Sequence, residues 1–130
     1  MREILFRGKT FDGEWEEGSL HIEYGETTAD GKRNLDYRIL GMRGECRYVD
    51  PETIGQYTGL CDKNGRKIFE GDICRVGHLL YMVEFNYSQW KFSILSAKVL
   101  CYPAFNSHCG ERCIIIGNVH DNPELLEGEG

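Results

Sequence analysis

Residues 108–113 have the side-chain types that bind metal ions. They read His-Cys-Gly-Glu-Arg-Cys, which places an imidazole and two thiols close together. Structural zinc takes four ligands, usually from two closely spaced pairs, but the other cysteines are scattered singly: Cys46, Cys61, Cys74 and Cys101. Of these, Cys101 precedes the same loop and could join the group in space. His108, Cys109 and Cys113 are therefore weak metal candidates, set against buried thiols or an oxidisable loop, and we expect no cofactor.

A cysteine beside a histidine can also serve as a catalytic nucleophile, because the imidazole accepts the thiol proton. The chain has six cysteines, and its histidines are His21, His78, His108 and His120. With this many, some pair would lie close by chance. The glycines do not form a phosphate-binding loop, because none leads into a Lys-Ser/Thr pair and a helix. We therefore assign no catalytic residues, and an enzyme is the third of three hypotheses.

Acidic side chains in the central stretch, Asp62, Glu70 and Asp72 with Tyr57, could be offered for acid–base catalysis. A structural role explains them better. Asn64-Gly65 is typical of a two-residue type I′ hairpin turn, and Asp62 can accept hydrogen bonds from such a turn. Glu70-Gly71-Asp72 resembles the entry into a strand of a small barrel. We assign structural roles to Asp50, Pro51, Gly55, Tyr57, Gly59, Asp62, Asn64, Gly65, Glu70, Gly71 and Asp72.

Aromatic and basic side chains could together form a stacking surface for single-stranded nucleic acid. The aromatic residues are Tyr24, Tyr37, Tyr57, Tyr81, Tyr87, Trp15 and Trp90, and the basic ones are Arg38, Arg43, Arg47, Lys63, Arg66 and Lys67. In β proteins, however, aromatic side chains more often pack in the core or pair across strands. The net charge of −6 also counts against nucleic acid, since binding requires neutralised phosphates. Nucleic-acid binding is our second hypothesis.

Length and composition indicate one soluble globular domain. The 130 residues fit a typical domain, and the 41% hydrophobic content argues against a disordered chain. Sixteen glycines against three prolines predict many tight turns. No apolar run is long enough for a signal peptide or a membrane span. We therefore expect a cytoplasmic protein with reduced thiols and no membrane partner.

Short segments with β character predict most of the secondary structure. We expect strands over residues 3–7, 14–24, 36–42, 56–60, 67–70, 73–76, 79–85, 90–95 and 113–119. Asp12-Gly13 and Asp30-Gly31 predict turns, the second within an exposed loop over residues 25–34. Asp50-Pro51 predicts a short capped helical turn, and residues 122–126 predict another. No long stretch has a helical period of 3.6 residues.

These elements predict a mostly β fold: a small antiparallel β-barrel or sandwich-like domain with short helical turns. The domain spans residues 1–125, followed by a flexible tail over 126–130. Within it, a β lobe over 1–49 and another over 68–122 can be joined by the stretch 49–73.

The stretch 49–73 resembles the signature of the YopX family of phage and prophage proteins. It reads Val-Asp-Pro-Glu-Thr-Ile-Gly-Gln-Tyr-Thr-Gly-Leu-Cys-Asp-Lys-Asn-Gly-Arg-Lys-Ile-Phe-Glu-Gly-Asp-Ile. The opening Arg-Glu-Ile-Leu-Phe-Arg-Gly and the ending Ile-Gly-Asn-Val-His-Asp-Asn-Pro-Glu-Leu-Leu are similar to that family too, although Gly8-Lys-Thr replaces a more usual Ala-Trp-Asp. Residues 18–44 and 75–113 match nothing specific.

The resemblance implies a mostly β protein of phage or prophage origin with no established biochemical activity, so it supplies no catalytic residues. Our first hypothesis is a non-enzymatic accessory protein in the host cytosol that binds protein, as a homo-oligomer. Short edge strands and aromatic β surfaces make pairing between chains plausible. We expect the functional surface in the less typical regions, residues 18–44 and 75–113.

Overall fold

The structure, a computed structural model, describes residues 4–77, 79–86, 89–94 and 112–127. Within these ranges it contains nine strands and one short 3₁₀ helix, and every strand pairing is antiparallel. The predicted mostly β, antiparallel fold is therefore confirmed. The chain divides into two compact units, Met1–Gln56 and Tyr57–Gly130.

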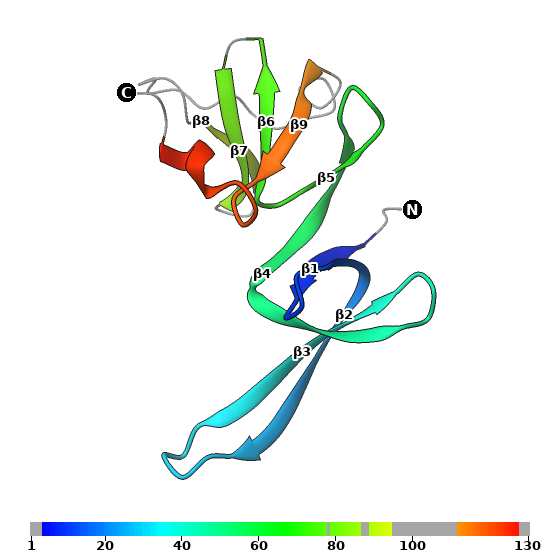
Figure 1. The fold of residues 1–130 in the computed structure, drawn as a ribbon, viewed down its shortest axis with the longest axis vertical. Coiled ribbons are helices and arrows are strands. Elements are labelled where there is room, and N and C mark those ends of the chain that lie inside the picture. Colours follow the sequence, from blue (N-terminus) through cyan, green and yellow to red (C-terminus); the bar gives the residue numbers. More distant parts are fainter. Residues whose placement is uncertain (1–3, 78, 87–88, 95–111, 128–130) are drawn as a thin grey trace. The chain divides into compact units, whose positions relative to one another are not determined.

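The first unit is a ring-like sheet. Its strands are β1 (Phe6–Thr10), β2 (Trp15–Thr27), β3 (Arg33–Gly41) and the first part of β4 (Cys46–Cys61). Each strand pairs with the next, and β4 returns to pair with β1, as Figure 1 shows. Ile39 and Val49 are fully buried in this unit. Gly8 is required beside Val49, because a Cβ on Gly8 would lie 2.8 Å from its side chain.

β2 and β3 extend from the ring as a two-stranded ribbon, which we call the arm (residues 20–39). Its pairing runs from Leu20↔Ile39 to Thr27↔Arg33. Among the described residues, β1 pairs with β2 only as far as Gly18, and β4 pairs with β3 only over residues 38–40. The exposed loop predicted over residues 25–34 is wrong in extent, because residues 25–27 belong to β2 and residues 33–34 to β3, which leaves only residues 28–32 between the strands (Figure 1).

Four hairpin turns share one hydrogen-bond pattern. In the turn at Asp62, the N–H of Gly65 donates to the carbonyl of Asp62 at 3.0 Å, and the N–H of Asp62 donates to the carbonyl of Arg66 at 2.8 Å. Gly65 has a φ of 81°. These bonds enclose three residues and end in a left-handed glycine, which is the bulged three-residue hairpin. The predicted turn at Asn64-Gly65 is therefore correct in place, but the two-residue geometry is wrong. The other three turns place Gly13, Gly31 and Gly44 at the same position.

The predicted helical turn at Asp50-Pro51 is wrong, because these residues lie within β4. The Asp50 carboxylate does accept a hydrogen bond from the N–H of Glu52 at 3.0 Å. The pairing of β4 with β1 shifts in register here, from Arg7↔Gly55 to Lys9↔Asp50. More residues lie between these two pairs on β4 than on β1, so β4 forms a bulge. A bulge tolerates Pro51, which has no N–H to donate.

The second unit contains the end of β4, a short hairpin partner and a four-stranded sheet. β5 (Lys67–Phe69) pairs with β4 from Tyr57 to Cys61. The sheet has the order β8 (Gln89–Ile94), β7 (Leu79–Asn86), β6 (Asp72–Val76) and β9 (Ile114–Asn118). The buried cluster of the second unit consists of Ile68, Cys74, Tyr81, Val83, Cys113 and Ile115.

A 3₁₀ helix, η1 (Pro123–Glu127), follows the last strand of the sheet. It agrees in place with the second predicted helical turn, over residues 122–126. It also takes in the first two residues of the predicted tail. Residues 128–130 lie outside the described part.

Candidate functional site

Two carboxylates of the central stretch, those of Asp62 and Asp72, accept hydrogen bonds from backbone groups. Oδ1 of Asp62 accepts the N–H groups of Asn64 and Arg66, each at 2.9 Å, and Oδ2 accepts the N–H of Ile115 at 3.0 Å. Oδ2 of Asp72 accepts the N–H of Phe69 at 2.8 Å. Both side chains are buried. A buried carboxylate that already accepts backbone hydrogen bonds stabilises the fold and is poorly placed to exchange protons with a substrate.

Other residues of the central stretch also have structural surroundings. Tyr57 is buried and packs on Phe69 with ring centroids 5.6 Å apart, and its hydroxyl lies 3.6 Å from Sγ of Cys61. Gly59 and Gly71 adopt φ values of 90° and 92°, which glycine tolerates best. Gly71 also donates its N–H to the carbonyl of Val83 at 2.8 Å.

Two thiols meet inside the second unit. Cys74 on β6 and Cys113 beside β9 are both fully buried. A hydrogen bond with Cys113 is the main cause that raises the pKa of Cys74, followed by burial and by the nearby charges of Cys113, Asp72 and Asp62. Cys74 therefore stays protonated at neutral pH and is a poor nucleophile, because the thiolate is the reactive form.

The predicted metal candidates are only partly covered by the structure. His108 and Cys109 lie outside the described residues, and Cys113 points into the core with Cys74. Across residues 4–77, 79–86, 89–94 and 112–127, no group of three or more His, Cys, Asp or Glu side chains is arranged to hold a metal ion. Four cysteines are described as free thiols: Cys46, Cys61, Cys74 and Cys113.

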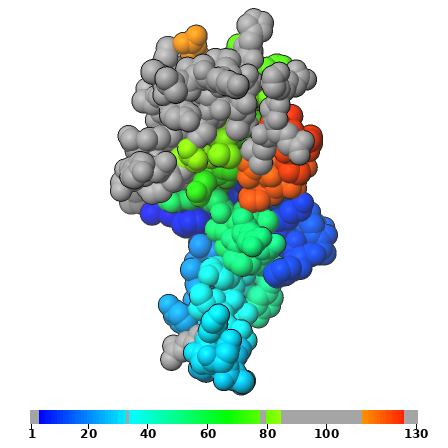
Figure 2. All heavy atoms as spheres, turned by 90° about the vertical axis from the view of Figure 1, so that its left-hand side faces the viewer, coloured from blue at the N-terminus to red at the C-terminus, as the bar shows by residue number. Residues whose placement is uncertain are grey.

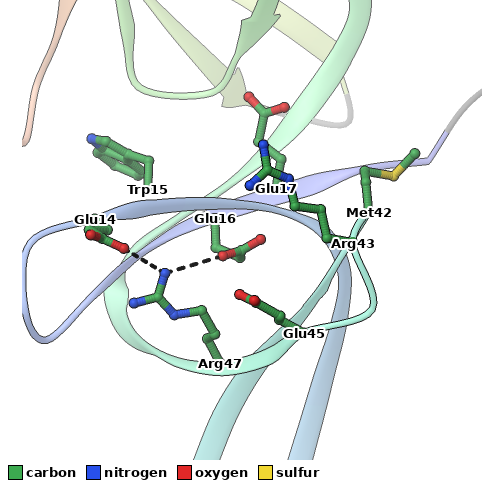
Figure 3. A pocket seen from close by; sticks show the side chains of 8 residues that line it. All are labelled: Glu14, Trp15, Glu16, Glu17, Met42, Arg43, Glu45 and Arg47. Carbon is green, nitrogen blue, oxygen red and sulfur yellow. Dashed lines mark hydrogen bonds and ion pairs between the residues drawn. The ribbon is translucent and has the colours of Figure 1, made fainter.

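A hollow of about 470 Å³ lies in the first unit (Figure 3). Arg47 is part of its lining. The guanidinium of Arg47 forms ion pairs with the carboxylates of Glu14 at 2.7 Å, Glu16 at 3.5 Å and Asp12 at 3.4 Å. The hydrogen bond from Arg47 to Glu14 is the main cause that raises the pKa of Arg47. The lining has four carboxylates and two guanidinium groups, so it does not favour a phosphate chain. Its residues are Glu14, Trp15, Glu16, Glu17, Met42, Arg43, Glu45 and Arg47.

One face of the arm is apolar. Side chains alternate between the two faces of a strand, so Ile22 and Tyr24 of β2 share a face with their cross-strand partners Tyr37 and Leu35 of β3. Ile22 is 48% exposed, Tyr24 is 70% exposed and Leu35 is 40% exposed. We call these four residues the arm quartet. In Figure 2 the blue-to-cyan spheres of β2 and β3 show part of this ribbon.

The opposite face of the arm is charged. It presents His21, Glu23, Asp36 and Arg38. Arg38 forms an ion pair with Glu23, and its guanidinium lies 5.5 Å from the ring centre of Tyr48 on β4. The arm is therefore a ribbon with one polar face and one apolar face.

An exposed apolar face on a ribbon is a candidate interaction surface. An isolated two-stranded hairpin is marginally stable in water and gains stability when its apolar face is covered. Contiguous exposed apolar residues often mark contacts with other proteins. The sequence predicted a functional surface within residues 18–44 or 75–113, and the arm lies in the first of these ranges. The exposed apolar face itself was not predicted, although the alternation of Leu20, Ile22 and Tyr24 was its signal.

The aromatic residues proposed for stacking have different surroundings. Tyr24 and Tyr37 belong to the arm quartet, whereas Tyr57 and Tyr81 are buried in the second unit. Trp15 is covered by Arg7, whose guanidinium lies 4.8 Å from the ring centre. Tyr87 and the side chain of Trp90 lie outside the described part.

Among the residues that the structure describes, no helix is both long and apolar enough to cross a bilayer.

Comparisons with known proteins agree with this fold. Protein EF1440 from Enterococcus faecalis has a similar crystal structure, with a TM-score of 0.55 and 24% sequence identity, over 98% of this chain and 100% of that one. No curated protein sequence matches the chain significantly. The family model described as YopX protein matches residues 6–127, nearly the whole chain. The resemblance carried by the stretch 49–73 is thus confirmed, and the chain belongs to the YopX family.

Proposed function

We propose that this chain is a non-enzymatic protein-binding module that uses the apolar face of the arm. We further infer that it is an accessory protein of a phage or prophage, acting in the host cytosol. The arm quartet carries the proposal, because three of its four side chains are at least 40% exposed and none is charged. An apolar surface of this kind gains free energy when another apolar surface covers it.

The surroundings of the other candidate groups support a non-enzymatic role. Asp62 and Asp72 accept backbone hydrogen bonds inside the second unit. Arg47 is neutralised by three carboxylates around it. The buried thiol of Cys74 is held protonated by its raised pKa. By contrast, Ile22, Tyr24 and Leu35 on the apolar face of the arm are 48%, 70% and 40% exposed.

Nucleic-acid binding is the alternative, and one contact favours it. Arg38 stacks against Tyr48, which is 54% exposed, and such a pair can receive a base and a phosphate. This pair lies on the charged face of the arm region, beside Glu23. A gel-shift assay with single-stranded DNA and RNA at low and high salt separates the two hypotheses. Salt-sensitive binding that is lost in Arg38→Gln favours nucleic acid, and no binding at low salt eliminates it.

Site-specific photocrosslinking tests the protein-binding proposal in cells. A photoreactive phenylalanine analogue replaces Tyr24 on the apolar face or, as a matched control, His21 on the charged face of the same strand. We expect position 24 to give defined crosslinked proteins, identified by mass spectrometry, and position 21 to give few. Equal or absent crosslinking at both positions would contradict binding through the apolar face.

A further inference from the structure

We propose that the apolar face of the arm is covered by the same face of a second copy of this chain. The inference rests on the proposed protein-binding function and names its partner. The arrangement of side chains in the arm quartet carries it. A two-fold interface requires that a surface be complementary to itself, and the quartet meets this requirement.

The arm quartet alternates aliphatic and aromatic side chains in two directions. Its first row pairs Ile22 on β2 with Tyr37 on β3, and its second row pairs Tyr24 on β2 with Leu35 on β3. Each tyrosine therefore has an aliphatic neighbour both across the ribbon and two residues along its own strand. The two tyrosines lie on one diagonal and the two aliphatic residues on the other.

This alternation makes the face complementary to a copy of itself. A two-fold axis along the strands, in the plane between two facing arms, places Ile22 over Tyr37 of the second copy and Tyr24 over Leu35 of the second copy. An axis across the strands places Ile22 over Tyr24 of the second copy and Tyr37 over Leu35 of the second copy. Both axes set every tyrosine against a smaller aliphatic side chain. Facing large and small side chains in this way lets two layers interdigitate.

The exposed area fits a small dimer interface. Given their exposed fractions, Ile22, Tyr24 and Leu35 present about 300 Å² of largely apolar surface, taking about 200 Å² for each whole residue. An interface is about 57% apolar, so this core corresponds to about 500 Å² per copy once a polar rim is included. The total of about 1,000 Å² lies at the lower limit for specific complexes. Buried area alone does not determine affinity. An interface of this size is typical of weak, transient complexes, for which we take a dissociation constant of about 10–100 µM.

Charge gives the dimer a distinguishing property. Each copy carries a net charge of −6, so two copies repel each other. Added salt screens this repulsion, and the dimer should become tighter between about 0.05 and 0.5 M salt. A basic partner on the same face would instead bind less tightly as salt is added.

Sedimentation equilibrium of the purified full chain tests the inference. We expect a monomer–dimer equilibrium that tightens with salt and weakens at least about tenfold in Tyr24→Thr and Ile22→Thr. Threonine keeps the β propensity of these positions, and circular dichroism checks that each variant is folded. His21→Thr and Asp36→Thr on the opposite face are the matched controls and should leave the equilibrium within about twofold.

A monomer up to about 200 µM at high salt would overturn the inference. A dimer that Tyr24→Thr does not weaken would overturn it as well. Crosslinks from position 24 to another protein, with the purified chain monomeric, would reject the second copy and keep the proposed protein-binding function. Crosslinks from position 24 to a second copy of the chain support both proposals.

Discussion

The carboxylate of Asp62 accepts a hydrogen bond from the backbone N–H of Ile115 at 3.0 Å, although 53 positions separate the two residues in the sequence. The same side chain holds the turn that follows it. The neighbouring N–H of Lys63 donates to the carbonyl of Cys113 at 2.9 Å. The hairpin turn after β4 is thus fixed to the start of β9 by one buried carboxylate and one backbone bond.

Replacing Asp62 should destabilise the second unit strongly. Asp62→Ala leaves three N–H groups without their acceptor, and a buried donor left unsatisfied costs about 1–3 kcal/mol. Because the opened site admits water, we expect a total loss of about 2–4 kcal/mol in the free energy of unfolding. Urea unfolding followed by circular dichroism measures it. Asp30→Ala, in an exposed turn of the same pattern, is the control and should cost far less. Equal effects at both positions would contradict the anchoring role.

Gly18 should be irreplaceable on β2. A Cβ at this position would overlap the backbone carbonyl oxygen of Leu40 on the paired strand. Backbone cannot move away as a flexible side chain can, so Gly18→Ala should lower the free energy of unfolding by about 2–4 kcal/mol. Gly25→Ala on the same strand is the control, because its Cβ would lie 3.2 Å from the carbonyl oxygen of Asn34. Thermal melts of the two variants should rank in that order, and the reverse order would refute the close approach.

The pKa of Asp12 should be lower than that of an ordinary aspartate. The hydrogen bond from the Thr10 hydroxyl is the main cause that lowers the pKa of Asp12, and Arg47 adds a smaller effect in the same direction. A lowered folded-state pKa stabilises the turn above the unfolded pKa of about 3.9, and this contribution is lost as the pH falls through the folded value. NMR titration of the carboxyl carbon measures it. We expect Thr10→Val to raise the pKa of Asp12 further than Arg47→Gln does, and no change in Thr10→Val would contradict the assignment.

Cysteine reactivity should separate surface thiols from core thiols. Cys46 and Cys61 are exposed, whereas Cys74 and Cys113 are buried. Alkylation of the native protein, mapped by peptide mass spectrometry, should modify Cys46 and Cys61 within minutes and spare Cys74 and Cys113 until urea unfolds the protein. The raised pKa of Cys74 adds to its protection, because the thiolate is the reactive form. Rapid native labelling of Cys74 would show that the core of the second unit opens readily.

Much of the local structure could be predicted from the sequence. Asp-Gly and Asn-Gly pairs marked three of the four bulged turns, because glycine alone readily adopts the required positive φ. The fourth turn, at Gly44, lacks such a pair and was not predicted. Most strands were predicted from short β-forming segments, but β4 was read as a helical turn followed by a brief strand. Pro51 suggested the start of a helix. Only the pairing of β4 with β1 shows that Pro51 lies in a β-bulge.

The tertiary structure decided which residues meet. Sequence spacing could not show that Asp62 reaches Ile115, or that Cys113 meets Cys74 in the core, since both contacts depend on strand order within a sheet. It also could not show that Ile22 and Tyr24 are exposed, because an alternating strand looks the same whether or not another layer covers its apolar face. The sequence by itself determined the family, the strand-rich class and three of the four bulged turns, which depend on local backbone preferences. The pairing register determined the arm quartet, because only cross-strand contact brings Tyr37 and Leu35 beside Ile22 and Tyr24.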